Sequence, residues 1–184
     1  MIKKGLISVL MVVILPLFLY STQDEYLRKA ALFKVFSEYI KWPEETGMND
    51  PSKAFVISII GKNPFDSILE AAYHEAKRKI KDKIVEIRYI SRPEEINNCH
   101  ILFISKSIDK EQELEEILAV TRGKPILTIG ETKGFAEKGV LFNLFISRDE
   151  IRFEINAQAL RESRLIPSSQ LLSVAKIVGS LEAP

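Results

Sequence analysis

Short apolar runs rich in β-branched residues alternate along this chain with segments of helical periodicity. Residues 54–60 (AFVISII) contain a single polar side chain, and residues 100–104 and 125–129 are similarly apolar. Strands have this composition when helices cover both faces of their sheet. Helical spacing of apolar residues follows two of these runs, at 65–72 and at 114–121. The alternation predicts an α/β domain with a largely parallel sheet.

Three other segments complete the predicted sheet. Residues 84–90 alternate between apolar and charged side chains, which is typical of a strand near a sheet edge. Residues 140–146 and 151–155 are separated by four polar residues, which predicts an antiparallel hairpin. Helical spacing after Pro167 predicts a closing helix over residues 171–178. We therefore expect a single layered αβα domain with a mostly parallel central sheet, a hairpin near the C-terminal end and a closing C-terminal helix.

A helix is predicted before the first strand, over residues 25–41. Leu27, Ala31 and Val35 have helical spacing and are assigned to its inner face, with Leu32, Phe36 and Ile40 as further candidates. The helix should end at residues 42–43 (Trp-Pro), because a residue before proline avoids the α conformation.

The first 23 residues have the pattern of a secretory signal peptide. Lys3 and Lys4 precede an uncharged run over residues 5–20, and a polar segment follows. A transmembrane anchor is the alternative, but sixteen helical residues span only ~24 Å of a ~30 Å hydrocarbon core. Pro16 would also break a spanning helix. We predict a signal peptide over 1–23, a domain over 24–184, and a periplasmic product with no stable membrane insertion after cleavage.

Composition restricts the possible chemistry of the chain. The 26 basic and 25 acidic residues nearly balance, which argues against a nucleic-acid partner held by bulk charge. A single cysteine excludes an internal disulfide and a multi-thiolate zinc site. The sequence contains no phosphate-binding loop, nucleophile elbow or zinc-protease motif. We therefore predict no cofactor, no metal and no enzymatic activity.

Candidate binding residues follow the predicted strands, because ligands of open parallel sheets bind outside the carboxyl ends of the strands. The turn at 61–65 suits an anion at a helix N-terminus, but structural capping, with Asn63 as N-cap and Pro64 as first helical residue, is the favoured interpretation. Glu131 suits either a binding site or a cap of the following helix. Arg152 and Glu154 share a strand face, which favours a surface ion pair between them, and Asn156 is placed to cap a helix beginning at 157. The candidate ligand- or partner-binding residues are Gly61, Asn63, Pro64, Phe65, Gly130, Glu131, Phe135, Arg152, Glu154 and Asn156.

The order of these motifs resembles the YfiR/HmsC-like family of small exported proteins. The resemblance rests on residues 31–33 and 39–43, 61–65, 99–105, 127–131 with 134–135, 142 with 152–156, and 168–172. It implies a periplasmic regulator that binds the periplasmic sensor domain of a membrane-bound diguanylate cyclase and restrains it. Cyclic di-GMP and biofilm formation would then fall. The alternative is a periplasmic small-ligand-binding accessory of a transporter or sensor kinase.

Cysteine content is where this chain departs from the family. The best-known relatives carry several cysteines whose disulfide state tunes their activity, whereas this chain has only Cys99. Cys99 is thus the sole redox candidate, and a homodimer linked through it requires an exposed thiol. Its position at the edge of an apolar strand argues against that exposure. Cys99 and His100 would point to opposite faces of a strand, which argues against a catalytic dyad.

Overall fold

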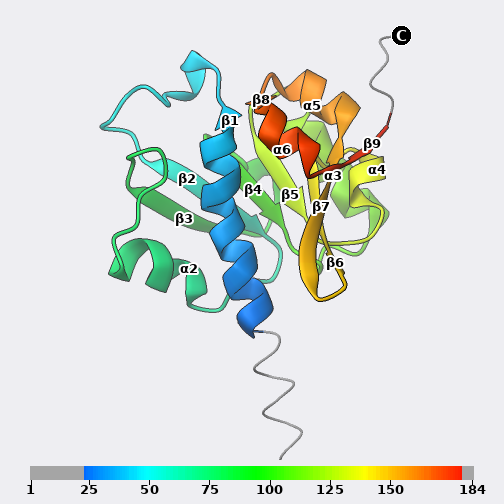
Figure 1. Cartoon of the computed structure of the whole chain (residues 1–184), viewed down its shortest axis with the longest axis horizontal. Coiled ribbons are helices and arrows are strands. Elements are labelled where there is room, and N and C mark those ends of the chain that lie inside the picture. The colour runs from blue at the N-terminus through cyan, green and yellow to red at the C-terminus, as the bar shows by residue number, and fades with distance from the viewer. Residues whose placement is uncertain (1–22, 180–184) are drawn as a thin grey trace, which may run out of the picture.

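A seven-stranded sheet in the order β3-β2-β4-β5-β6-β7-β9 forms the centre of the molecule (Figure 1). The computed structural model describes residues 23–179, so the predicted signal peptide lies outside this range except for its last residue. The strands are β2 (Phe55–Ile60), β3 (Val85–Ile90), β4 (Ile101–Ile104), β5 (Leu127–Gly130), β6 (Phe142–Ser147), β7 (Glu150–Asn156) and β9 (Lys176–Val178). Strands β2 to β6 are parallel, β7 is antiparallel to β6, and β9 is parallel to β7. The parallel strands follow the order of flavodoxin-like doubly wound sheets.

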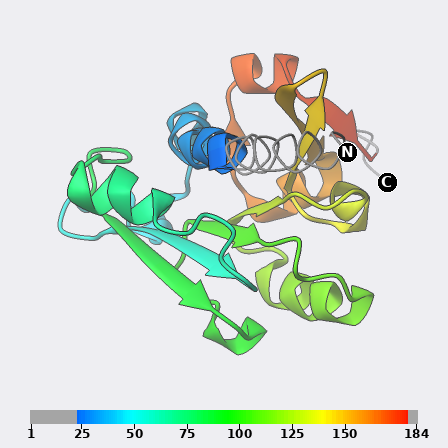
Figure 2. The ribbon, with the colours of Figure 1, turned by 90° about the horizontal axis from the view of Figure 1, so that it is seen from below.

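Helices cover both faces of this sheet (Figure 2). The N-terminal helix (residues 23–39) and α2 (Ile68–Glu70), which continues as the π-turn η2 (Ala71–Glu75), share one core with Phe55, Ile57 and Ile59. Helices α3 (Glu111–Thr121) and α4 (Phe135–Lys138) share the other core with Val56 and Ile60. Alternate residues of β2 thus enter opposite cores, which is why the run is apolar throughout. The predicted layered α/β fold is confirmed.

The remaining elements are short. Helices α5 (Ala157–Ser163) and α6 (Ser169–Ser173) follow β7, and 3-10 turns occur at η1 (Glu44–Thr46) and η3 (Pro93–Glu95). Strands β1 (Ile40–Lys41) and β8 (Ile166–Pro167) form a separate antiparallel pair that the sequence did not predict. Across residues 23–179, no helix has the length and apolar content needed to cross a membrane.

Several predicted details are confirmed. Strand β3 lies at the sheet edge, as its alternating pattern indicates. The buried face of α3 consists of Leu114, Ile117, Leu118 and Thr121, as predicted. Strands β6 and β7 form the predicted hairpin, although its turn contains only Arg148 and Asp149, both with positive φ. Two residues in this conformation form the turn that matches the twist of a tight hairpin.

The predicted inner face of the N-terminal helix is wrong at its first three positions, whereas two of the further candidates, Phe36 and Ile40, are buried. Leu27, Ala31 and Val35 are exposed, whereas the buried side chains are Tyr26, Lys29, Ala30, Phe33, Phe36 and Ser37. Both sets have helical spacing, so periodicity alone does not separate them. The set that faces the sheet carries three aromatic rings, which bury more apolar area than the aliphatic set does.

Three predicted helix ends also differ. The N-terminal helix ends at residue 39 rather than at residues 42–43, because residues 40–41 form β1 and pair with β8. Helix α2 begins at Ile68 rather than Pro64, because the Asn63 side chain accepts the N–H of Phe65 at 2.9 Å and donates to the carbonyl of Asp66. Asp66 has a φ of 47°, which interrupts any helix there. The closing C-terminal helix is present as α6, but it ends at Ser173, and residues 176–178 form the edge strand β9.

We predict that Phe33→Ala lowers the free energy of unfolding by about 3–5 kcal/mol, because Phe33 is fully buried and contacts Phe65 and Phe103. The exposed Leu27→Ala should cost less than about 0.5 kcal/mol. Urea denaturation of both variants measures the difference. A larger loss for Leu27→Ala than for Phe33→Ala would show that the other side of the helix faces the sheet.

Candidate functional site

The carboxyl ends of β2, β4 and β5 lie at one rim of the sheet, as predicted, but the chain itself fills this rim. The loop after β4 contacts the turn after β2, where the N–H of Lys62 donates to Ser107 Oγ at 2.8 Å. Gly61 has a φ of +92°, and a Cβ there would lie only 2.6 Å from Ser107 Oγ. Glycine at 61 therefore permits this close approach of the two loops.

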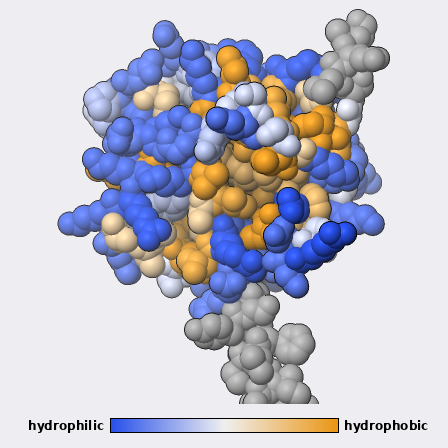
Figure 3. Space-filling model, in the orientation of Figure 1, coloured by the Kyte–Doolittle hydropathy of each residue, from blue (hydrophilic) through white to orange (hydrophobic). Residues whose placement is uncertain are grey.

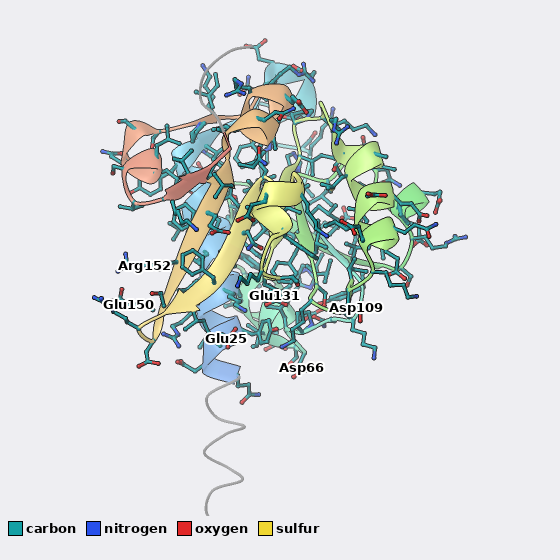
Figure 4. All side chains as sticks on the ribbon, turned by 90° about the vertical axis from the view of Figure 1, so that its right-hand side faces the viewer. Glu25, Asp66, Asp109, Glu131, Glu150 and Arg152 are labelled. Atoms are coloured by element: carbon teal, nitrogen blue, oxygen red, sulfur yellow. The ribbon has the colours of Figure 1, made fainter. Side chains whose placement is uncertain are left out.

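Glu131 is the central charged group of the rim, and it holds the N-terminal helix. Its Oε2 lies 2.5 Å from Lys29 Nζ, and its Oε1 accepts from the Tyr26 hydroxyl at 3.1 Å and from the N–H of Lys106 at 3.3 Å. Figure 4 shows Glu131 at the same end of the domain as Glu25, which also pairs with Lys29. Glu131 does not cap α4, whose N-cap is Gly134. With its side chain only 2% exposed, the carboxylate serves internal contacts.

Lys29 and Tyr26 complete this buried cluster. The Lys29 side chain is 5% exposed, and its ammonium group also lies 4.6 Å from the centre of the Tyr26 ring. Burial, followed by the negative charge of Glu131, raises the pKa of the Tyr26 phenol well above its usual range. Tyr26 therefore stays protonated and donates to Glu131. The cluster therefore has a structural role: it attaches the N-terminal helix to the rim of the sheet.

Other candidate residues of this region have packing roles. Phe65 is fully buried and meets the rings of Tyr26, Phe33 and Phe103, while Asn63 and the half-buried Pro64 form the turn before it. A Cβ at Gly130 would lie 2.8 Å from the Phe135 ring, so glycine there lets the buried Phe135 pack on β5. Because α2 begins only at Ile68, the turn at 61–65 does not lie at a helix N-terminus, so neither the favoured cap at Asn63 nor the alternative anion site is formed there.

The candidates on β7 are separated from this rim and from one another. Arg152 is exposed and pairs with Glu150 on the hairpin, away from Glu131 (Figure 4). Glu154 is buried and pairs with Lys176 of β9 at 2.7 Å, so the predicted pairing of Arg152 with Glu154 is wrong. The edge strand β9, which the sequence did not predict, supplies this lysine. Asn156 does cap α5, because its side chain accepts the N–H of Ala159 at 2.7 Å.

Cys99 and His100 occupy opposite sides of the sheet. Cys99 belongs to the core under α3, whereas the His100 ring stacks on Phe55 of the other core, with ring centres 4.7 Å apart. Burial raises the pKa of the Cys99 thiol to about 11 and lowers the pKa of His100. His100 Nδ1 also accepts the N–H of Val56 at 3.0 Å. The geometry provides neither a Cys–His dyad nor a thiolate.

The most exposed feature of the N-terminal helix is an apolar stripe formed by Leu27, Ala31, Val35 and Tyr39. Leu27 is 56% exposed, Val35 43% and Tyr39 44%. Figure 3 shows apolar side chains gathered at the centre of this face of the molecule. Sequence reasoning placed three of these four residues in the core. The competing aromatic stripe, Tyr26, Phe33 and Phe36, was the signal that would have corrected this assignment.

The apolar stripe forms one wall of a groove of about 750 Å³, and Ala72 and Tyr73 of η2 line the other. Burial raises the pKa of Tyr73 to about 12, and its hydroxyl donates to the carbonyl of Ala30 at 3.3 Å, which closes the groove floor. Arg28, Lys34, Arg78 and Glu38 also line the groove. Among residues 23–179, Lys34 and Arg78 form no ion pair. The groove therefore has an apolar centre and a cationic margin.

These observations define the class: a doubly wound α/β domain whose usual ligand rim is closed by its own N-terminal helix, which exposes an apolar stripe on its outer side. In the described part of the chain, no group of three or more His, Cys, Asp or Glu side chains could hold a metal ion. The YfiR/HmsC-like family matches residues 26–176, and the chain belongs to it. That match begins at Tyr26, within the helix that carries both the buried cluster and the apolar stripe.

We predict that Lys29→Met lowers the free energy of unfolding by about 3–5 kcal/mol at neutral pH, because it leaves the Glu131 carboxylate buried beside an apolar side chain. The double variant Lys29→Met/Glu131→Gln should recover a large part of this loss. Urea denaturation of the wild type, both single variants and the double variant measures the coupling. Additive losses would contradict a direct buried pair.

We predict that Cys99 resists alkylation in the folded protein. Its thiol is buried and its pKa is raised to about 11, so little thiolate forms at pH 8. Mass spectrometry should find no iodoacetamide adduct under conditions that fully label the protein in 6 M urea. Labelling of the folded protein at the rate of the unfolded protein would restore Cys99 as a redox candidate.

Proposed function

We propose that this protein is an exported, non-enzymatic regulator that binds the periplasmic sensor region of a membrane-bound diguanylate cyclase and restrains it. Membership of the YfiR/HmsC-like family supports a regulatory role in cyclic di-GMP signalling. The signal-peptide pattern of residues 1–23 supports export to the periplasm. Restraint of the cyclase lowers cyclic di-GMP and, with it, biofilm formation.

The main structural support for the proposal is the exposure of the apolar stripe. Large apolar side chains exposed together on one helix are typical of a protein–protein contact surface. Leu27, Val35 and Tyr39 lie along one side of the helix at intervals of four or eight residues, which suits a partner element lying along it. The helix is held rigidly beneath by Phe33 and by the Lys29–Glu131 pair, so the surface is formed before the partner arrives.

The margin of the groove suggests the chemistry of the partner. Arg28, Lys34 and Arg78 outnumber Glu38 around the apolar stripe. An amphipathic helix with apolar residues at its centre and carboxylates at its sides would match both properties. We propose that the cyclase's periplasmic region offers such a helix to this groove.

The decisive variant is Leu27→Glu/Val35→Glu, which places two charges on the apolar stripe without entering the core. We predict that deleting the gene raises cellular cyclic di-GMP several-fold and that expression of the wild-type protein reverses the increase. The double variant should leave cyclic di-GMP at the level of the deletion strain, because a buried interfacial charge without a partner opposes binding. Mass spectrometry of nucleotide extracts measures the effect.

The control is Ile84→Glu, at an apolar residue that is 71% exposed but lies just before β3 and outside the groove. This variant should lower cyclic di-GMP as the wild type does, and immunoblots should show equal amounts of all three proteins. An unchanged cyclic di-GMP level in the deletion strain, with the cyclase present, would overturn the proposed function. Full activity of the double variant would show that the apolar stripe does not contribute to this function.

A further inference from the structure

A second cavity lies at the opposite end of the sheet, where β2, β4 and β5 begin. It has a volume of about 470 Å³. Residues that precede β2, β4 and β5 form one part of its wall: Ala54, Asn98, Cys99 and Pro125. Glu86 and Arg88 of the edge strand β3 form another part. Ligand sites of small molecules commonly occupy volumes of about 300–1,000 Å³. The cavity is thus large enough for a small organic molecule, and it is distinct from the rim at Glu131.

The apolar part of the cavity is rigid. Val56 and Cys99 line it from the core under α3, and the His100 ring lines it while stacking on Phe55. Burial lowers the pKa of His100, and its Nδ1 accepts the N–H of Val56, so the ring is neutral and fixed in orientation. An apolar body placed against these residues meets a surface that does not need to rearrange.

The charged part of the cavity is unbalanced toward cations. Lys53, Arg88 and Lys124 line it together with two carboxylates, Glu45 and Glu86. Each carboxylate already has a partner: Glu86 pairs with Arg88 at 2.7 Å, and Glu45 pairs with Arg164. Across residues 23–179, neither Lys53 nor Lys124 has an ion-pair partner. Two lysines that form no ion pair, from separate segments, therefore share one cavity with an apolar wall, although Lys53 is close enough to Asp50 for its charge to lower the pKa of that carboxyl.

We propose that this cavity binds a small organic anion: an apolar body that packs against Val56, Cys99 and His100, with one carboxylate or phosphate group between Lys53 and Lys124. Flexible ammonium groups recognise either anion as point charges. The apolar wall excludes a simple inorganic ion as the preferred ligand, because such an ion leaves that surface unused. This site is independent of the proposed contact with a cyclase, since it shares no residue with the groove beside the apolar stripe.

The probes are 2-naphthoate, 2-naphthyl phosphate and the uncharged 2-naphthamide, which share a flat apolar body. Titration calorimetry and thermal denaturation of the purified protein should detect at least one of the two anions and not the amide. The anion that binds more tightly identifies the charged group. Inorganic phosphate alone should produce no shift in melting temperature at the same concentration.

The test variant is Lys53→Gln/Lys124→Gln, which should weaken binding of the preferred anion by about tenfold or more. Its matched control is Lys62→Gln/Lys133→Gln, which removes the same charge from two exposed lysines outside the cavity and should bind as the wild type does. A second variant, Ala54→Leu, narrows the cavity and keeps both lysines, and it should also weaken binding.

Three outcomes would overturn the proposal: no anion binds, 2-naphthamide binds as tightly as the anions, or the lysine variant retains wild-type affinity. Melting temperatures of the ligand-free variants verify that each is folded. Because these measurements need no partner protein, their failure leaves the cyclic di-GMP experiment unaffected, and failure of that experiment leaves this site unaffected.

Discussion

The packing of Phe33 and Phe36 against the sheet is the contact on which the rest of the structure depends. Phe33 meets Phe65 and Phe103, and Phe36 meets Phe142 and Phe153, so the N-terminal helix is joined to the turn before α2 and to β4, β6 and β7 at once. The helix carries two apolar stripes, and only one can face the sheet. Burial of the aromatic stripe leaves the aliphatic stripe in solvent, which is how a surface suited to a partner arises from the demands of the core.

The buried ion pair favours the same orientation of the helix. A buried pair adds little net stability, but leaving one member without its partner is costly. Rotation of the helix to bury Leu27 and Val35 would carry Lys29 away from Glu131 and leave that buried carboxylate beside the loop after β4 without its cation. Aromatic burial and charge pairing therefore agree. Their agreement closes the rim at which a doubly wound sheet normally binds its ligand.

Closure of that rim leaves two other places as the proposed binding surfaces. One is the apolar stripe on the outer side of the helix, and the other is the cationic cavity at the amino ends of the strands. Cys99 lines the second place but is buried, and its raised pKa removes the reactivity that a redox sensor requires. In this member of the YfiR/HmsC-like family, the buried Cys99 thiol therefore favours the proposed binding surfaces over thiol chemistry.

The sequence by itself determined the layered α/β fold, the edge position of β3, the buried face of α3 and the cap at Asn156, because each depends on composition or spacing within a few residues. Tertiary structure alone decided which stripe of the N-terminal helix is buried, since both have the same period. It also decided the partner of Glu131, which is a lysine 102 residues away in the chain. The partner of Glu154 is Lys176, which lies on a strand in a segment that the sequence predicts to be helical. Local patterns specify which elements form, whereas the pairing of distant side chains depends on how those elements pack.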